Sequence, residues 1–305
     1  MRFLVLGNPM AGAGRAMRLL PVITRLLTGA SHTMNGLIVP SVDEMRAKIR
    51  DARRSGFDAL MLMGGDGTVH QALPAILDSD LPFGIIPGGR GNDFARNLGI
   101  GSRDWRDWDL RAEPVLREID LPSINGVPFA SVACAGFDAT VNRLARARKG
   151  LMHGRIGYAV CVLRALHAVR TFPVSVRTGD AEWSGGVLMI AVANGPCYGG
   201  GMRIAPRAEM DDGRLDVCVV EEVPKRVLLS QFPNVYRGTH VSHPKVHTLT
   251  GPVVEITTDE PQDVYADGEY AGTLPAICTV SRRRVRVMSF PAISPASASP
   301  AMSRF

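Results

Sequence analysis

Residues 59–68 read ALMLMGGDGT, and residues 83–96 read FGIIPGGRGNDFAR. In each stretch a short apolar run is followed at once by glycines and an acidic residue. Two further apolar runs, Phe3–Leu6 and Leu37–Val39, extend a series in which strand-like runs alternate with segments of helical periodicity. The helical segments are residues 14–27, 42–55 and 68–77. This alternation predicts βαβ units and a parallel sheet.

The second half of the chain has a different texture. After about Asp120, glycine, proline and asparagine break it into short segments in which apolar and polar residues alternate. The clearest of these are Val174–Arg177, Gly185–Val192, Leu215–Val220 and Val253–Thr257, with one helical interruption at 141–170. Period-two segments of this kind are typical of antiparallel sheets. We therefore expect an α/β N-terminal domain with a parallel sheet and a second domain that is an antiparallel β-sandwich.

Composition narrows the functional class. Of the 305 residues 46% are hydrophobic, and 35 basic against 29 acidic residues leave a net charge of +6, so disorder is excluded for most of the chain. A mildly basic chain suits an anionic ligand or membrane, whereas a content of only 6% aromatic residues argues against nucleic acid, whose binding proteins interleave Lys/Arg runs with aromatics. The longest apolar run, Val187–Ala193, is too short to span a bilayer, and the five cysteines form no CxxC pair. These features predict a cytoplasmic protein with reduced cysteines.

Three glycine-rich loops follow the apolar runs, at residues 8–14, 64–68 and 87–96. Ligands of a parallel sheet lie at the carboxyl ends of its strands, where glycines let backbone N–H groups approach an anion. Any one loop alone would be an ordinary strand-to-helix turn. Three loops on one sheet edge, two of them with acidic residues, indicate a nucleotide. The sequence contains no GxxxxGK[ST], GxGxxG or HExxH motif, so other common nucleotide and zinc sites lack their motifs.

Six ordered motifs carry a family resemblance. They are GGDGT at 64–68, GNDFAR at 91–96, GFDA at 136–139, NGP followed by three glycines at 199–201, DDGRLD at 211–216 and DGE at 267–269. Together they resemble the catalytic domain of the diacylglycerol kinase family, in its soluble bacterial lipid kinase branch. GGDGT alone would be weak, because NAD kinases and phosphofructokinases share versions of it.

The resemblance implies a domain arrangement. A nucleotide-binding α/β domain like that of phosphofructokinases and NAD kinases would span residues 1–118 and be completed by residues 284–290, with Val285–Met288 as a returning strand. A β-sandwich lipid domain would span residues 119–283, and the active site would lie in the cleft between the two. Residues 291–305, rich in Pro, Ala and Ser, are expected to form a disordered tail.

The resemblance also implies an ATP site. Its residues would be Asn8, Gly12, Gly14, Gly64, Gly65, Asp66, Gly67, Thr68, Gly89, Arg90, Asn92 and Asp93, with Ser41 as a loosely aligned addition. Phosphoryl transfer needs positioning and charge neutralisation, and Asp66 and Asp93 are suited to hold Mg²⁺ directly or through water. The catalytic residues would be Asp66, Asp267 and Glu269, and whichever of the last two faces the acceptor would take its proton.

A second, structural Mg²⁺ site is implied at residues 209–216. The side chain of Asp212 and the backbone carbonyls of Glu209 and Arg214 would bind the ion, and Asp120 would contact it through water. Oxygen ligands in a tight turn fit Mg²⁺. The alternative is an Asp-Gly hairpin turn without metal.

Arg90 departs from the family pattern, which usually has Thr or Ser there against the nucleotide phosphates. An arginine can supply a bidentate phosphate clamp in place of the hydroxyl. It can equally crowd the γ-phosphate, change the nucleotide, or mark a relative that binds lipid without phosphorylating it.

The stretch 143–170 holds seven basic residues, including Arg146, Arg148 and Lys149, and no acidic residue. Such a basic amphipathic segment favours peripheral binding to a membrane surface, and the alternative is a solvated helix face. We therefore predict an ATP- and Mg²⁺-dependent lipid kinase that acts on a membrane lipid, most simply diacylglycerol. A kinase of a soluble acceptor, as in NAD kinases, and a non-catalytic lipid or nucleotide sensor remain alternatives, and the sequence leaves a homodimer and the acceptor lipid open.

Overall fold

The computed structural model describes residues 1–9, 14–101, 104–147, 155–168, 170–179 and 181–293. The chain divides into two compact units. The first comprises Met1–Ile119 and the chain from Val285 onward, and the second comprises Asp120–Arg284. The segment after Val285 therefore belongs to the same unit as the N-terminus.

The first unit is built on a six-stranded sheet with the order β2-β1-β3-β4-β17-β5. Its strands are β1 (Arg2–Gly7), β2 (Thr33–Ile38), β3 (Ala59–Gly64), β4 (Phe83–Pro87), β5 (Val115–Ile119) and β17 (Val285–Ser289). The pairs are parallel except for β17 with β5. Every residue of β3 is buried, as expected for a strand covered on both faces.

Helices connect the parallel strands of the first unit. They are α1 (Arg15–Gly29), α2 (Val42–Ala52), α3 (Asp66–Ser79) and α4 (Asp93–Asn97), followed by a 3₁₀ turn at Asp104–Arg106. Helix α2 begins after Ser41, whose Oγ accepts the N–H of Glu44 at 3.4 Å. Its buried residues Met45, Ile49 and Ala52 recur at helical spacing and face the core.

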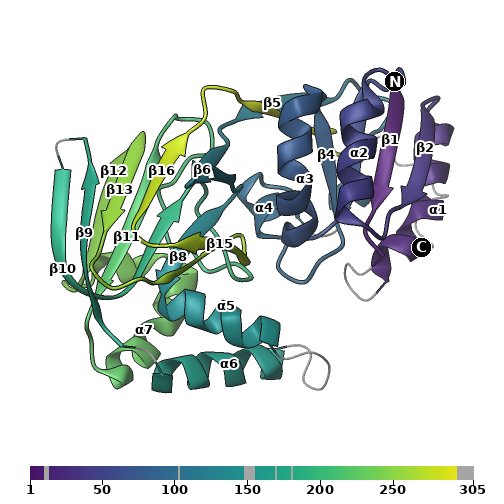
Figure 1. Ribbon diagram of the computed structural model, residues 1–305. Helices are drawn as coiled ribbons and strands as arrows, with labels where there is room; N and C mark the ends of the chain where they lie inside the picture. Colours follow the sequence, from purple (N-terminus) through teal and green to yellow (C-terminus); the bar gives the residue numbers. More distant parts are fainter. Residues whose placement is uncertain (10–13, 102–103, 148–154, 169, 180, 294–305) are drawn as a thin grey trace. The chain divides into compact units, whose positions relative to one another are not determined.

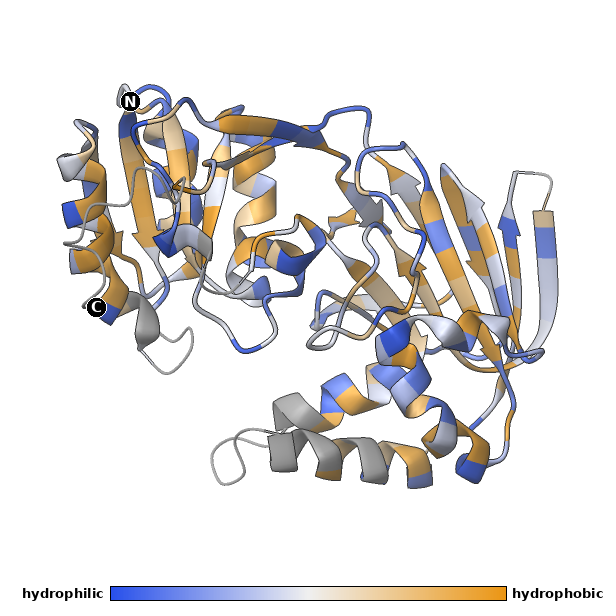
Figure 2. Cartoon of the chain, turned by 180° about the vertical axis from the view of Figure 1, so that it is seen from behind, coloured by the Kyte–Doolittle hydropathy of each residue, from blue (hydrophilic) through white to orange (hydrophobic). Residues whose placement is uncertain are grey.

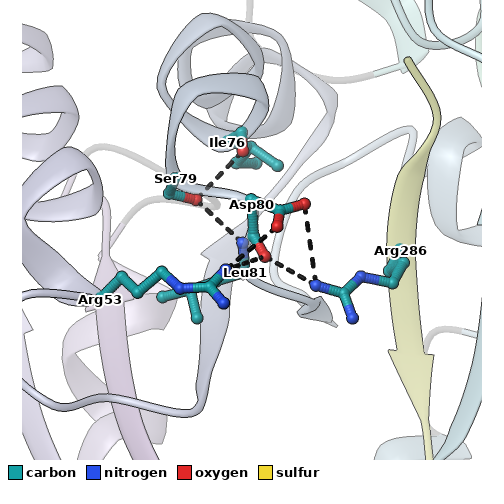
Figure 3. Close-up of polar contacts among 6 residues, drawn as sticks. All are labelled: Arg53, Ile76, Ser79, Asp80, Leu81 and Arg286. Atoms are coloured by element: carbon teal, nitrogen blue, oxygen red, sulfur yellow. Dashed lines mark hydrogen bonds and ion pairs between the residues drawn. The ribbon is translucent and has the colours of Figure 1, made fainter.

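The end of α3 is fastened to two distant segments (Figure 3). Asp80 ends the helix in the left-handed conformation with φ 53°. Arg53 donates to the Asp80 carbonyl at 3.1 Å and to its Oδ2 at 3.0 Å, and Arg286 of β17 donates to the same carbonyl at 2.7 Å. Cations stabilise the free carbonyls at a helix C-terminus. This contact holds the strand that returns to the first unit against α3.

The second unit is antiparallel throughout its strand pairs. The strand order is β15-β14-β8-β10-β9-β13-β16-β6-β7, and β11 pairs with β10 and β12. The strands are β6 (Pro122–Ile124), β7 (Val127–Pro128), β8 (Val132–Gly136), β9 (Phe172–Thr178), β10 (Ala181–Ala193), β11 (Leu215–Glu221), β12 (Val246–Gly251), β13 (Val253–Thr257), β14 (Asp263–Ala266), β15 (Glu269–Thr273) and β16 (Ala276–Val280). The predicted fold class, a parallel α/β domain followed by an antiparallel β domain, is confirmed.

Strand β10 separates two apolar cores. Ile190 and Val192 face a core enclosed by strands, whereas Met189 and Ala191 face a core shared with helices. The helices are α5 (Phe137–Ala147), α6 (Arg155–Ala168) and α7 (Lys225–Arg237), with a 3₁₀ turn at Thr239–Ser242 (Figure 1). Figure 2 shows hydrophobic and hydrophilic residues alternating along several strands of this unit. The alternation has the period of two that a sheet requires.

Two elements differ from the sequence-based expectation. Strand β2 covers Thr33–Ile38 instead of Leu37–Val39, because it is an edge strand paired only with β1 and needs no continuous apolar run. Helix α7 was not expected, because Pro233 lies inside the segment and proline usually ends or kinks a helix. Among the helices of the described ranges, none is both long and apolar enough to cross a membrane.

Candidate active site

The first glycine loop follows β1. The N–H of Asn8 donates to the carbonyl of Met63 at 3.2 Å, which joins the end of β1 to that of β3. Gly14 precedes α1 with φ 81°, a conformation that glycine adopts without strain. Gly12 lies outside the described residues. The loop thus opens at the carboxyl end of the central strands, where ligands of parallel sheets bind.

The second and third glycine loops interlock. A Cβ on Gly65 would lie 2.8 Å from the Cα of Gly89, and a Cβ on Gly89 would lie 2.5 Å from the Cα of Gly65. A Cβ on Gly64 would lie 2.2 Å from the Oγ1 of Thr68, which is itself buried. No side chain fits at these glycines. Their backbones can pack together only because both loops lack a Cβ at the crossing.

Asn92 fixes the third loop. Its Oδ1 accepts the N–H of Gly89 at 2.8 Å, and its Nδ2 donates to the carbonyl of the same glycine at 3.0 Å. Asn92 adopts φ 53°, which asparagine tolerates better than most residues. The amide therefore closes the Gly88–Asn92 turn and positions it against the Gly64–Thr68 loop.

Two carboxylates face Gly91. A Cβ on this glycine would lie 2.8 Å from Asp66 Oδ2 and 3.1 Å from Asp93 Oδ2. Asp66 begins α3, and its Oδ1 accepts the N–H of Phe94 at 2.9 Å. Asp93 begins α4, is 6% exposed and pairs with Arg96, which also donates to the carbonyl of Gly91 at 3.1 Å. The two motifs, far apart in sequence, thus present one acidic pair.

The donor chemistry of this acidic pair fits Mg²⁺. Within the described ranges, no three His, Cys, Asp or Glu side chains are grouped so that they could hold a metal by themselves. Mg²⁺ does not need such a cage, because it usually takes one or two carboxylates and completes its shell with water and substrate phosphates. Asp66 and Asp93 supply two carboxylates beside glycine loops that can approach phosphate.

Arg90 is exposed and lines a pocket of about 400 Å³ on the far end of the third loop. The other lining residues are Gly91, Asn92, Arg96, Gly99, Ile100 and Gly101. The pocket therefore carries two guanidinium groups and several glycine backbones. Guanidinium groups bind phosphate oxygens with two parallel hydrogen bonds, so this pocket suits an anion.

In the second unit, the DGE motif forms a hairpin turn between β14 and β15. Asp267 and Gly268 both have positive φ, 50° and 83°, as two-residue hairpin turns require. The Asp267 carboxylate accepts the N–H groups of Ala130 at 2.7 Å, Ser131 at 2.8 Å and Val132 at 3.3 Å. Both of its oxygens are therefore used to hold the turn against the chain that enters β8.

Glu269, two residues later, begins β15 and is partly exposed. Its place at the start of the strand follows from the Asp267 turn. A carboxylate fixed by three backbone donors is poorly placed to accept a substrate proton, because that proton would compete with the N–H groups. The structure therefore favours Glu269 over Asp267 as a base.

The DDGRLD motif forms a second turn. Asp212 Oδ1 accepts the N–H of Arg214 at 2.9 Å, and Gly213 has φ 73°. Asp120, 2% exposed, holds the turn directly: its Oδ2 accepts the N–H of Gly213 at 2.7 Å. Its Oδ1 accepts from Arg284 at 2.9 Å, and Arg284 also donates to the carbonyl of Asp211 at 2.8 Å. Asp120 therefore acts as a structural clamp on the turn.

Acidic groups gather at this turn. Burial, followed by the charge of Asp212, raises the pKa of Asp216 to about 6, with Glu209 adding to the effect and Arg214 opposing it. Mutual repulsion of this kind is relieved when a cation binds between the groups. The carboxylate and carbonyl oxygens of the turn are ligands that Mg²⁺ accepts.

An apolar cavity of about 70 Å³ lies between the helices and the sheet of the second unit. Most of its lining is aliphatic or aromatic, from α5, α6, α7 and neighbouring strands. Asp138 and Tyr198 are polar residues of the wall, and the tyrosine hydroxyl donates a hydrogen bond to Asp138 Oδ2. Burial raises the pKa of the Asp138 carboxyl to about 6, and the hydrogen bond from Tyr198 opposes that shift. The cavity wall is thus mainly apolar, and Gln231, His240 and His243 are its other polar residues.

Two family models match the chain. The diacylglycerol kinase catalytic domain matches residues 2–124, and the YegS C-terminal NAD kinase beta sandwich-like domain matches residues 131–289. A diacylglycerol kinase of Mycobacterium tuberculosis is 33% identical over 278 residues, which are 89% of each chain. The chain belongs to the diacylglycerol kinase family. The resemblance predicted from the six motifs is confirmed, and membership in a kinase family implies the use of ATP.

Other members of the diacylglycerol kinase family are more distant. A diacylglycerol kinase of Bacillus subtilis is 26% identical over 242 residues, covering 78% of this chain and 80% of that protein. A crystal structure of a diacylglycerol kinase of Bacillus anthracis matches with a TM-score of 0.71 at 20% identity, covering 97% of this chain and 98% of that one. The fold is therefore shared over nearly the whole length.

Most of the residues predicted as an ATP site lie in the loops that follow β1, β3 and β4. Asp66, Thr68, Asn92, Asp93 and the glycines at 64, 65 and 89 belong to the interlocked loops, while Asn8 joins the first loop to β3. Ser41 instead caps α2. Arg284, Asp138 and Tyr198 were missed by sequence reasoning. The sequence singles out Asp138 as part of the GFDA motif but assigns it no role.

Proposed function

We propose that this member of the diacylglycerol kinase family transfers the γ-phosphoryl group of ATP to the hydroxyl of a lipid, most simply diacylglycerol. The apolar cavity carries this choice of acceptor. A binding site for a soluble acceptor such as a dinucleotide would need several polar groups to fix its orientation, whereas the cavity wall offers mainly aliphatic side chains. A long hydrocarbon chain is the ligand that such a wall accepts.

In this proposal the glycine loops bind the triphosphate of ATP. Asn8, Gly14 and the backbones of Gly65 and Gly89 belong to these loops, and the glycines place no side chain of their own over the N–H groups that would approach the anion. Arg90 adds a guanidinium group on the exposed side of the third loop. The positive charge of this group replaces the small hydroxyl that other family members carry.

Asp66 and Asp93 would hold Mg²⁺, directly or through water. The ion neutralises charge on the phosphoryl group when it is bound. The hydrogen bond from Phe94 to Asp66 and the ion pair of Asp93 with Arg96 fix both carboxylates before a ligand arrives. At the second turn, Asp212 and the carbonyls of Glu209 and Arg214 would hold a structural cation, while Asp120 and Arg284 keep the turn closed.

Glu269 would accept the proton of the lipid hydroxyl. As that proton leaves, the hydroxyl oxygen forms its bond to the γ-phosphorus, the bond to the β-phosphate oxygen breaks, and ADP departs. Asp267 would position Glu269 by keeping the hairpin turn bound to residues 130–132. The second unit would thereby supply the acceptor site and the base.

Binding to a membrane surface through residues 143–170 is part of the same proposal. In the described part of this stretch, Arg143 and Arg164 are exposed. Arg148 and Lys149 lie outside the described residues, as does the side chain of Arg146. The described helices α5 and α6 contain one acidic residue between them, Asp138, which is buried. Their exposed charge is therefore basic.

The test is transfer of labelled phosphate from ATP into vesicles that carry diacylglycerol, a sphingoid base, ceramide or phosphatidylglycerol, separated by thin-layer chromatography. We expect label in at least one lipid, and label in NAD alone would favour a soluble acceptor. Glu269→Gln should lower kcat by about 100-fold with ADP affinity unchanged, as expected when proton transfer is lost. Glu260→Gln, an exposed carboxylate of the same unit, serves as the matched control.

Asp267→Asn separates the two carboxylates. The asparagine amide would bring N–H groups against backbone N–H donors, so this variant should lose about 1 to 3 kcal/mol of unfolding free energy as well as activity. Glu269→Gln should keep the wild-type Tm. Wild-type turnover in Glu269→Gln would remove Glu269 from the mechanism.

A further inference from the structure

Helix α7 is basic and lies in a long segment without acidic residues. The sequence contains no Asp or Glu from Val223 to Val254. Within the helix, Lys225, Arg226 and Arg237 carry positive charge, and Lys225 Nζ donates to the carbonyl of His167 at the end of α6 at 3.4 Å. The N-terminal end of α7 therefore adjoins the basic helix α6.

The inner face of α7 forms one wall of the apolar cavity. Val227, Leu228, Gln231, Phe232 and Val235 recur at helical spacing and line it. None of the α7 residues is fully buried. The helix thus covers the cavity without the close packing that holds a core helix in place.

The cavity is too small for a lipid chain while α7 covers it. Its volume is about 70 Å³, roughly half that of an apolar cavity of about 150 Å³ that binds a single benzene. Any acyl chain of ordinary length must displace part of the wall. The loosely packed wall is α7, since residues Val187–Ala193 of β10 and most residues of β11 are buried in the sheet.

The backbone of α7 supports such movement. Pro233 lies inside the helix and has no N–H to donate to the carbonyl of Leu229, so one turn lacks its regular hydrogen bond. Gly238, with φ 74°, fixes the C-terminal end, where a Cβ would lie 2.8 Å from Pro206. The helix is therefore anchored at its end and weakened in its middle.

The outer face of α7 combines exposed apolar residues with cations. Tyr236 is 43% exposed, and Arg226 and Arg237 lie on the same side at helical spacing. Leu229 is 46% exposed at the edge of this face, where it also lines the cavity. The nearest acidic residues precede the helix: Glu221 is paired with Lys245 and His247, and Glu222 is exposed. Cations that flank aliphatic and tyrosine side chains are typical of helices that lie in a bilayer interface.

We propose that the outer face of α7, formed by Arg226, Leu229, Tyr236 and Arg237, docks on an anionic phospholipid bilayer, which brings the wall of the apolar cavity against the acyl chains. The proposal rests on the proposed function in that the cavity receives a lipid chain. Charge complementarity selects an anionic surface, and the exposed leucine and tyrosine select one with an accessible apolar layer. Docking on this face places the displaceable wall where lipid enters.

Docking can be measured without catalysis. All five native cysteines are buried, so Leu229→Cys can be labelled selectively with an environment-sensitive nitrobenzoxadiazole dye. Vesicles of phosphatidylcholine and phosphatidylglycerol should shift its emission to the blue, whereas pure phosphatidylcholine should have a much smaller effect. Ile277→Cys, 52% exposed on β16 of the same unit, is the matched control. No shift at position 229, or an equal shift at position 277, would overturn the proposal.

The charge of α7 is tested by vesicle co-sedimentation. Arg226→Gln together with Arg237→Gln should weaken binding to anionic vesicles about 30-fold, which is about 1 kcal/mol per cation near the surface. Arg207→Gln together with Arg282→Gln, two exposed cations outside α7, should leave binding within about 2-fold. Equal binding by the α7 variant and the wild type would contradict the proposal.

A third measurement separates this inference from the proposed function. The Arg226→Gln and Arg237→Gln double variant should retain phosphate transfer to a short-chain, water-soluble diacylglycerol and lose most transfer to vesicle-bound diacylglycerol. Equal loss on both substrates would overturn the docking role of α7. If the wild type binds vesicles through position 229 but phosphorylates no lipid, the proposed function fails while the docking surface stands.

Discussion

The interlocked glycine loops and the cavity beneath α7 are packed in opposite ways. At the loops, Gly65 and Gly89 approach so closely that neither tolerates a Cβ, and Asn92 closes the turn with two hydrogen bonds. Under α7, the helix has no fully buried residue and covers an empty apolar space. The first region is rigid because its backbone is in contact, and the second is loose because side chains line a cavity.

This difference matches the two ligands of the proposed lipid kinase activity. Phosphate groups are small and highly charged, so a site that binds them gains most from donors fixed before binding. A lipid chain is long, flexible and held by apolar area, so its site needs a wall that can move. One chain can meet both needs because its two units have separate cores.

The largest effect is expected from breaking the rigid region. Gly65→Ala would place a methyl group 2.8 Å from the backbone of Gly89, which cannot retreat without opening the third loop. We expect a loss of about 2 kcal/mol in unfolding free energy and at least a 100-fold loss in ADP affinity, measured by thermal unfolding and calorimetry. Gly29→Ala, where no atom lies within 4 Å of the new Cβ, should be neutral or slightly stabilising. Wild-type ADP binding in Gly65→Ala would mean that the loops are not interlocked in solution.

A smaller effect is expected at the outer edge of the same region. If Arg90 binds nucleotide phosphate, Arg90→Ala should raise the KM for ATP and weaken ADP binding by about 10-fold, because a hydrogen bond to a charged group contributes about 1.5 to 3 kcal/mol. Lipid binding and Tm should not change, since the side chain is exposed. One outcome would contradict a phosphate-binding role for Arg90. A silent wild type together with an active Arg90→Thr would show that Arg90 blocks the γ-phosphate.

The smallest effect on nucleotide binding is expected at the Asp138–Tyr198 pair in the cavity wall. Burial raises the pKa of Asp138 to about 6 in the folded protein from an ordinary value of 3.8, so folding favours its protonated form. Stability should therefore fall as the pH rises from about 4 to about 6. Relative to the wild type, Asp138→Asn should gain about 3 kcal/mol of unfolding free energy between pH 4 and pH 8, since the pKa shift is about two units and each unit is about 1.4 kcal/mol, measured by urea unfolding. A pH-independent difference would show that the carboxyl is not desolvated by the cavity.

The sequence predicted the order of elements well where residues act through local pattern. The buried strand β3 and the glycines after it follow from ALMLMGGDGT, because a strand covered on both faces is apolar throughout. The alternating strands of the second unit follow from their period of two. Helix α7 was missed because Pro233 lies inside it, although the residues that line the cavity recur at helical spacing.

In the candidate site too, local motifs predicted which residues matter, whereas the contacts between distant segments were not predicted. The motifs singled out Asp66, Asp93, Asp267 and Glu269 by type and spacing, but both hairpin carboxylates were equally plausible bases. In the tertiary structure the two carboxylates differ, because that of Asp267 accepts the backbone N–H groups of residues 130–132, a segment more than 130 residues away in the chain. Hydrogen bonding between distant segments leaves no local pattern in a sequence.

By itself, the sequence determined the two-part architecture, the glycine-rich loops and membership in a kinase family, because glycine, apolar runs and acidic motifs act where they stand in the chain. Only the tertiary structure decided that Gly65 packs on Gly89, that Arg284 and Asp120 clamp the DDGRLD turn, and that α7 covers an apolar cavity. Each of these depends on which distant segments meet, and that is set by the packing of whole layers, to which every strand and helix contributes.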